Sequence, residues 1–210
     1  MKISKLTATI LIIFICFTAI CIVKFVGKQS KSNSLTKIAL SRTKGDAKAR
    51  VHITEYIDFQ CPACARGSLM LKEYTKKYPS DIYLEVKYYP ISKIHQYALK
   101  SAMYAECAAR QNKFWAFQDI LIEKQSQWAG RINADPMLKE LAQDASLDLK
   151  KLEACIEDDS VKAAILQEKS DAKSLGVDST PTYFVNGKMV VGPKPLAEEL
   201  AVYLKGENHQ

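Results

Sequence analysis

From Val51 to Phe59 every second position is apolar except Glu55, and this alternation stops just before the sequence Cys61-Pro62-Ala63-Cys64. A period of two predicts a β-strand that is buried on at least one face. Beyond Phe59 the apolar spacing becomes helical and continues to Pro79, and Pro62 suits the first turn of a helix. The two cysteines are therefore predicted at a strand-to-helix junction.

The rest of the chain predicts a strand, a helical block, a β-hairpin and a helix. These elements occupy, in that order, Asp81–Ile91, Ser92–Leu175, Thr180–Val191 and Pro193–Leu204. Asn186-Gly187 is the strongest short signal for the hairpin turn. Strands on both sides of a helical block need partners, so the hairpin should return to the sheet formed by the first two strands. We predict an α/β protein with a central mixed β-sheet flanked by helices and with an all-helical domain inserted in it.

The length of 210 residues allows one domain with a hydrophobic core and an N-terminal appendage. No segment is large enough for a separate dimerisation domain, so we expect a monomer. We divide the chain into a signal anchor or signal peptide (1–31), a tether with a candidate edge strand (32–50), the first part of the sheet domain (51–91), the helical insert (92–175) and the second part of the sheet domain (176–204).

The N-terminal segment is uncharged from Leu6 to Val23 and has a dense apolar core at Ile10–Val23. That length suits an export signal and reaches the lower end of a bilayer span, about 17–25 residues. The sequence lacks a clear cleavage motif, which favours an uncleaved anchor over a removed signal peptide. With either outcome, the remainder of the chain is predicted to be exported.

The formal net charge of +7 comes mainly from this segment, because residues 1–31 contain five lysines and no acidic residue. Removing those five charges leaves +2 for the rest of the chain. So small an excess is not typical of a nucleic-acid-binding surface, and we expect no nucleic-acid partner.

The Cys-x-x-Cys pair is the candidate redox site. A Cys61 thiolate at the start of a helix faces unpaired N–H groups, which lower the pKa of a cysteine. Cys61 is therefore the candidate nucleophile, and Cys64, one turn later, is the candidate resolving cysteine. Glu55 lies on the apolar side of the first strand, where burying a charge is costly, and we expect it to exchange a proton with Cys64.

Two further features bear on this site. Cys-x-x-Cys also opens many zinc sites, but no second closely spaced Cys/His pair follows, so we predict no metal. Pro181 begins a predicted strand, which suits the edge or mouth of a sheet, and the preceding Thr180 would then expose backbone groups. We hypothesise a cis Thr180–Pro181 bond.

A strand that ends in FQCPAC, a helical insert and then GVDSTPTYFVNG together resemble the DsbA-like branch of the thioredoxin superfamily, over about Val51 to Leu204. The resemblance implies a thioredoxin fold with a helical insertion. It also implies roles for individual residues: Cys61 as the exposed nucleophile, Cys64 as the resolving cysteine, Glu55 as the buried acid, and Thr180-Pro181 as the substrate-facing loop.

From this resemblance we expect a thiol-disulfide oxidoreductase, on the periplasmic or extracytoplasmic side of the membrane, that introduces disulfides into unfolded or partly folded exported proteins. A quinone-linked membrane protein would reoxidise it, and no metal or organic cofactor is required. Strong oxidants of the family carry His where this chain has Ala63, so its disulfide should be less oxidising. A reductase or isomerase of the same fold, and a non-enzymatic redox-sensing or metal-binding module, are the alternatives.

Cys107 and Cys155 are a second candidate pair, because both lie in helical stretches of the insert and some similar proteins carry an extra disulfide there. We expect a structural disulfide, since exported proteins tend to oxidise cysteines that lie close together. Two free buried cysteines acting as small apolar residues are the alternative.

Overall fold

The computed structural model describes residues 14, 16–22, 24 and 41–204, in two units divided after Leu40. The described residues of the first unit are helical, and Cys16 and Cys21 are exposed there. Most of the candidate anchor at residues 1–31 lies outside the described residues. Among those that are described, no helix combines the length and the apolar character needed to span a bilayer.

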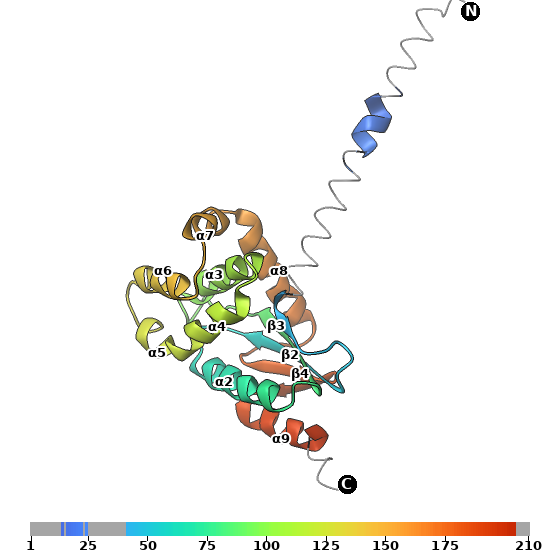
Figure 1. Cartoon of the computed structure of the whole chain (residues 1–210), viewed down its shortest axis with the longest axis vertical. Helices are drawn as coiled ribbons and strands as arrows, with labels where there is room; N and C mark the ends of the chain where they lie inside the picture. Colours follow the sequence, from blue (N-terminus) through green and yellow to red (C-terminus); the bar gives the residue numbers. More distant parts are fainter. Residues whose placement is uncertain (1–13, 15, 23, 25–40, 205–210) are drawn as a thin grey trace, which may run out of the picture. The chain divides into compact units, whose positions relative to one another are not determined.

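The second unit is built on a mixed five-stranded sheet (Figure 1). Its strands are β1 (Thr43–Lys44), β2 (Val51–Ile57), β3 (Ile82–Tyr88), β4 (Thr182–Val185) and β5 (Lys188–Val191). They are ordered β1-β3-β2-β4-β5, with β2 and β3 parallel and the other neighbours antiparallel. The predicted return of the hairpin to the first sheet is therefore confirmed, because β4 pairs with β2. Strands β1 and β5 are the two edges of the sheet, and β1 lies within the segment 32–50 where an edge strand was predicted.

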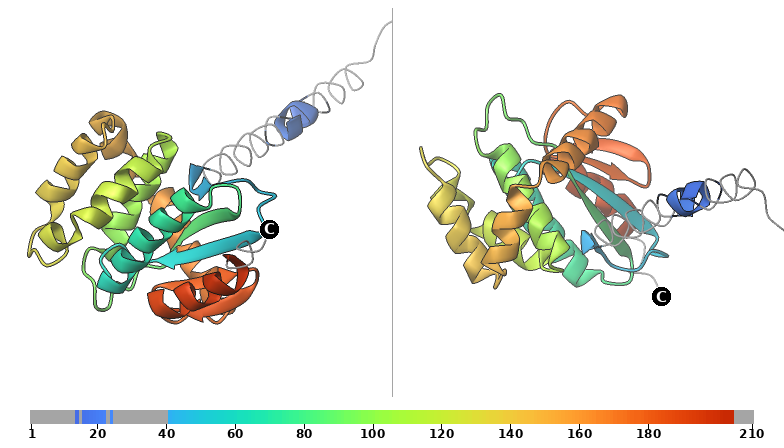
Figure 2. Two further views of the ribbon diagram at one scale, coloured as in Figure 1. Left: turned by 60° about the horizontal axis from the view of Figure 1, so that its bottom comes forward. Right: turned by 90° about the horizontal axis from the view of Figure 1, so that it is seen from above.

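Helices connect and cover these strands. They are α2 (Pro62–Lys77), α3 (Ala98–Arg110), α4 (Phe114–Glu123), α5 (Gln125–Trp128), α6 (Asp135–Asp144), α7 (Leu149–Ile156), α8 (Asp159–Ser174) and α9 (Pro193–Leu204). Helix α2 joins the parallel strands β2 and β3, and α3 to α8 all lie between β3 and β4. In both views of Figure 2 the green and yellow helices of this insertion gather to one side of the sheet.

The two faces of the sheet are covered by different helices. One face contacts α2, and α9 packs beside α2 and against β4 and β5. On the other face Tyr56 and Val177 pack with Ala172 of α8. The alternating residues of β2 and β3 that face α2 are almost fully buried, so the predicted burial of this parity is confirmed. A ridge of alanines on α3 is also buried: Ala98, Ala102, Ala105 and Ala109.

The hairpin turn follows from its residue types. Asn186 and Gly187 have φ angles of 48° and 85°, which Asn and Gly adopt more readily than other residues. The Asn186 side chain also accepts a hydrogen bond from the His52 backbone N–H at 2.8 Å and donates one to the Arg50 carbonyl at 3.1 Å. These contacts tie the tip of the hairpin to β2.

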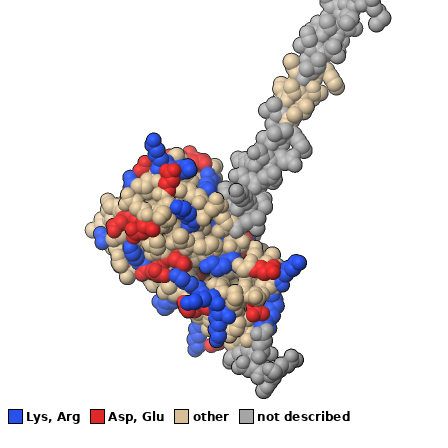
Figure 3. Space-filling view, viewed as in Figure 1, with Lys and Arg blue, Asp and Glu red and all other residues tan. Residues whose placement is uncertain are grey.

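The charged side chains on the surface do not separate by sign. On the face shown in Figure 3, Lys and Arg lie among Asp and Glu over the second unit. Lys72 of α2 contacts Asp119 at 2.9 Å and Glu123 at 2.8 Å, which links α2 to the insert through α4.

Candidate active site

Cys61 is the N-cap residue of α2, and Pro62 occupies the first helical turn. The Cys61 backbone is extended (φ −76°, ψ 122°), and Cys61 is the last residue of the loop that follows β2. A proline here costs no hydrogen bond, because the first N–H groups of a helix have no intrahelical partner. The predicted strand-to-helix junction is therefore confirmed, and it places the first cysteine at the positive end of the helix.

The thiol pKa values of the two cysteines are shifted in opposite directions. A hydrogen bond from the Cys64 thiol is the main cause that lowers the pKa of Cys61 to about 5, against the opposing effect of burial. The backbone N–H groups of Cys64 and Ala63 lower this pKa further. Cys64 is fully buried, and burial raises the pKa of its thiol well above the usual value. Near neutral pH, Cys61 is therefore the thiolate and Cys64 the thiol.

The cis-proline loop lies across from the cysteine pair. The Thr180–Pro181 peptide bond is cis, as hypothesised. The Cys61 sulfur lies 3.5 Å from the Thr180 carbonyl oxygen, although 119 positions separate the two residues in sequence. The Thr180 hydroxyl is buried and has no hydrogen-bond partner within the protein. The loop therefore contacts the pair through the backbone carbonyl of Thr180, and the buried Thr180 hydroxyl remains unpaired.

Glu55 lies beneath α2, fully buried on the central strand β2. Ser68 donates a hydrogen bond of 2.9 Å to its Oε1, whereas Oε2 has no partner. Burial raises the pKa of Glu55 to about 7, and the Ser68 hydrogen bond only partly opposes this shift. The carboxyl group can therefore gain or lose a proton near neutral pH, as proton exchange with a thiol requires.

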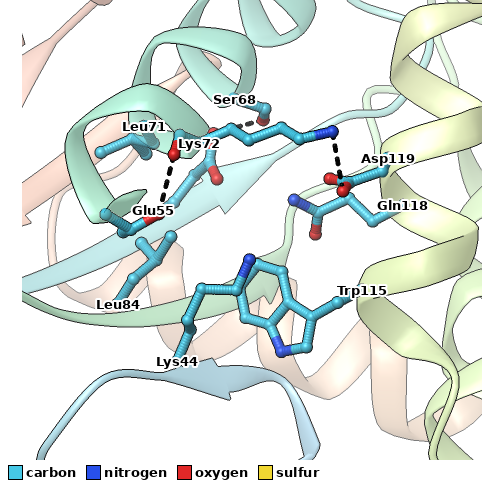
Figure 4. A pocket seen from close by; sticks show the side chains of 10 residues that line it. Lys44, Glu55, Ser68, Leu71, Lys72, Leu84, Trp115, Gln118 and Asp119 are labelled. Carbon is cyan, nitrogen blue, oxygen red and sulfur yellow. Dashed lines mark hydrogen bonds and ion pairs between the residues drawn. The ribbon is translucent and has the colours of Figure 1, made fainter. Parts of the chain in front are cut away.

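Glu55 also lines a small pocket between the sheet, α2 and α4 (Figure 4). The pocket volume is about 10 Å³, the space of about one water molecule. Lys44, Lys72 and Asp119 also line the pocket, and the side-chain oxygen of Gln118 in its wall has no partner. A water in this pocket would have at least two unsatisfied polar atoms to bind.

The second cysteine pair lies in the insert. A disulfide joins Cys107 of α3 to Cys155 of α7, 48 positions apart in sequence. It cross-links two helices of the insertion and lies on different elements from the Cys61 and Cys64 pair. Among the described residues, no group of three or more His, Cys, Asp or Glu side chains could hold a metal ion.

A family model described as Thioredoxin matches residues 39–204 of this sequence. The chain belongs to the thioredoxin family. Its fold is the DsbA-like form, with helices inserted between β3 and β4, as the sequence predicts.

Solved structures of similar fold include alpha-DsbA1 of Wolbachia pipientis, with a TM-score of 0.68 and 23% identity over 78% of this chain and 89% of that one. Oxidised BdbD of Bacillus subtilis has a TM-score of 0.66 and 20% identity, over 79% of this chain and 93% of that one. Among curated proteins, Na(+)/H(+) antiporter NhaA 3 of Salinispora tropica is 33% identical over 150 residues. That match spans 71% of this chain but only 22% of the antiporter.

Several polar residues of this thioredoxin-family site were not predicted from the sequence. The buried Asp58 carboxylate accepts hydrogen bonds from the backbone N–H groups of Gln60 and Ile91, both at 2.9 Å. Gln125, from the insert, donates to the carbonyls of Phe59 at 2.7 Å and Cys61 at 3.0 Å. These bonds fix the loop before Cys61. In the sequence, the only hint of these contacts is that Asp58 and Gln60 are polar residues just before the cysteine motif.

His95 adds a further side chain to this loop and lies in the turn segment before α3. Its Nδ1 is 2.8 Å from the buried Asp58 carboxylate, and only 18% of its side chain is exposed. This contact forms because the segment after β3 folds back over the loop after β2, and it joins residues 37 positions apart.

Proposed function

We propose that this protein is a thiol-disulfide oxidoreductase that works chiefly as a dithiol oxidase on exported proteins. The opposite acidities of Cys61 and Cys64 carry the proposal. A thiol with a pKa of about 5 leaves readily as a thiolate. The mixed disulfide between Cys61 and the substrate therefore breaks readily when a substrate disulfide forms. Cys64 is buried and stays protonated, so it forms mixed disulfides poorly. The mixed disulfide with the substrate is therefore assigned to Cys61.

The reaction begins from the Cys61–Cys64 disulfide. A substrate thiolate attacks the Cys61 sulfur, the disulfide breaks, and its electron pair passes to the Cys64 sulfur, which takes a proton from Glu55. A second substrate thiolate then attacks the substrate sulfur of the mixed disulfide and releases Cys61 as a thiolate. The substrate loses two electrons, and the protein gains them as a dithiol. A quinone-linked membrane protein is the proposed oxidant that restores the disulfide.

The substrates are unfolded or partly folded chains that lie extended against the Thr180-Pro181 loop. The Thr180 carbonyl is close to the reacting sulfur. Backbone pairing beside it would bind many sequences, because main-chain groups are common to all peptides.

Refolding of a reduced, unfolded protein that needs several disulfides tests this function. The wild-type disulfide form should restore substrate activity, and Cys61→Ser should not. Cys64→Ser, the matched control, keeps Cys61 but cannot form the Cys61–Cys64 disulfide, so it should not oxidise the reduced substrate. Mixed instead with a substrate that already carries a disulfide, its Cys61 thiolate should attack that disulfide, expel a substrate thiolate and leave a mixed disulfide that non-reducing electrophoresis detects. A fully active Cys61→Ser protein would refute the proposal.

The reduction potential separates the oxidase from a reductase or isomerase of the same fold. Ala63 favours the reductase alternative, because it contributes no cation to stabilise the Cys61 thiolate. A potential near or below about −270 mV, comparable with thioredoxin, would count against the oxidase.

The proposed location is the extracytoplasmic side of a membrane, with residues 1–31 as the anchor. Full-length protein should then sediment with membranes, and a chain that begins at residue 32 behind a cleavable export signal should be released in soluble form. Equal release of both chains would indicate that the N-terminal segment is removed.

A further inference from the structure

The face of α2 that covers the sheet is unusually small and polar near the active site. Its buried residues are Cys64, Gly67, Ser68, Leu71 and Thr75. Buried helix faces usually carry larger apolar side chains. The small residues in the second turn of α2 leave room for two polar side chains that rise from the sheet, those of Glu55 and Tyr183.

Tyr183 fills that space from β4. It is fully buried, and it pairs directly with Glu55 in the antiparallel register of β2 and β4. Paired residues project from the same face of a sheet, with Cβ atoms about 4.5–5.5 Å apart. Both side chains therefore point toward α2.

Gly67 makes room for the hydroxyl of this tyrosine. A Cβ atom at Gly67 would lie 1.8 Å from the Tyr183 hydroxyl oxygen and 3.2 Å from the adjacent ring carbon. The clash therefore comes from the hydroxyl. With phenylalanine at position 183 the severe overlap would be gone, and the remaining 3.2 Å contact with the ring would need a shift of only a few tenths of an ångström. The absence of a side chain at Gly67 therefore makes room chiefly for the hydroxyl.

The Tyr183 hydroxyl and the Oε2 atom of Glu55 are both buried, and neither has a hydrogen-bond partner. Buried polar groups are nearly always bonded, and an unpaired one calls for an explanation. Here an unpaired donor and an unpaired acceptor lie on cross-strand partners. Ionisation of Glu55 would add a negative charge that the hydroxyl can bind, and a hydrogen bond to a charged group is stronger than a neutral one.

We propose that the Tyr183 hydroxyl is a hydrogen-bond donor reserved for the Glu55 carboxylate, and that Tyr183 is thereby a positioning residue for the proton that Glu55 exchanges with Cys64. When Glu55 gives its proton to the Cys64 sulfur, the new carboxylate accepts one hydrogen bond from Ser68 and a second from Tyr183. The role in exchange rests on the proposed function, but the hydrogen bond itself does not.

Other titratable groups also surround Glu55. They come from the start of α2 (Cys61 and Cys64), from further along α2 (Lys72), from β1 (Lys44), from α4 (Asp119) and from β4 (Tyr183). From β3, the residue paired with Glu55 is the apolar Val86. Burial raises the pKa of Tyr183, and negative charge at Glu55, Cys64 and Cys61 raises it further, so Tyr183 remains a neutral donor.

Titration of the Glu55 carboxyl carbon by NMR tests the proposal directly. The signal is assigned by its loss in Glu55→Gln. Tyr183→Phe should make Glu55 about a tenfold weaker acid, a rise of about one pKa unit, because a donor to the charged form is lost. Tyr104→Phe, which removes a hydroxyl from a largely buried tyrosine of the insert, should leave the Glu55 titration unchanged. An unchanged pKa in Tyr183→Phe would overturn the proposal.

Gly67→Ala supplies an independent route to the same test. Its methyl group displaces the hydroxyl, so it too should raise the pKa of Glu55, and it should add no further rise in a Tyr183→Phe background. If Gly67→Ala raised the pKa of Glu55 by the same amount with Phe at position 183 as with Tyr, the proposal would be overturned. The rise would then come from a change in α2 and not from loss of the Tyr183 hydroxyl.

The kinetic consequence is measured as the pH profile of Cys61–Cys64 disulfide reduction by a small dithiol. Tyr183→Phe should move the inflection due to Glu55 upward by the same amount as the NMR titration, and should have no effect on the profile of Glu55→Gln. An equal slowing at every pH in both backgrounds would assign Tyr183 a packing role and overturn the proposal. If wild-type protein fails to oxidise substrates but the NMR shift appears, the proposed function fails and this inference stands.

Discussion

The acidity of Cys61 depends chiefly on a single neighbouring thiol, and this dependence gives a quantitative prediction. A pKa of about 5 leaves about one Cys61 in a hundred protonated at pH 7. The hydrogen bond from Cys64 is the largest cause, and hydrogen bonds to charged groups contribute about 1.5–3 kcal/mol. At about 1.4 kcal/mol per pKa unit, Cys64→Ala should raise the pKa of Cys61 by about one to two units.

Cys64→Ser is the matched control, because its hydroxyl can still donate to the Cys61 thiolate. We expect a smaller rise in pKa for this variant than for Cys64→Ala. The assay follows the ultraviolet absorbance of the thiolate against pH, with the titration of Cys61→Ser subtracted to remove the other free cysteines. A pKa that stays near 5 in Cys64→Ala would refute the reasoning and assign the effect to the backbone N–H groups of α2.

The remaining predictions concern stability. Burial raises the pKa of Glu55 from 4.5 to about 7, so the folded state binds this proton more tightly than the unfolded state does. Its contribution is therefore fully present below about pH 4.5 and is lost as pH rises through about 7. The stability advantage of Glu55→Gln over wild type should grow by about 3 kcal/mol between these limits, measured by denaturant unfolding at pH 4.5 and pH 8; an advantage that does not change with pH would contradict this assignment. Separately, Cys107→Ala with Cys155→Ala should lower the free energy of unfolding by about 2–4 kcal/mol, because the disulfide closes a long loop in the unfolded chain. Equal stability of this double variant and the wild type would contradict it, and the reduction potential of the Cys61 pair should stay unchanged.

Local patterns in the sequence predict the framework of this fold well. The alternation over β2, the proline after Cys61 and the Asn186-Gly187 turn each encode their conformation within a few residues, since backbone preference and side-chain period are local properties. The position of the pair at a helix start follows from the same signals. A helix start predicts the lowered pKa of Cys61, but the largest cause in the structure is the hydrogen bond from the Cys64 thiol, and the helix N–H groups contribute less.

The sequence alone thus determined the strand-to-helix junction, the order of the elements and the candidate redox pair. Tertiary structure decided what surrounds that pair. The contacts of His95 with Asp58, of Gln125 with the Cys61 carbonyl, and of Tyr183 with the space above Gly67 join segments 37 to 116 positions apart. Such contacts depend on strand register and on how the helices pack, and neither can be predicted from the spacing of residue types along the sequence. The sequence predicted the site as two sulfurs, an acid and a cis-proline loop. The fold adds the distance between Cys61 and the Thr180 carbonyl and a buried hydroxyl on the strand next to the acid.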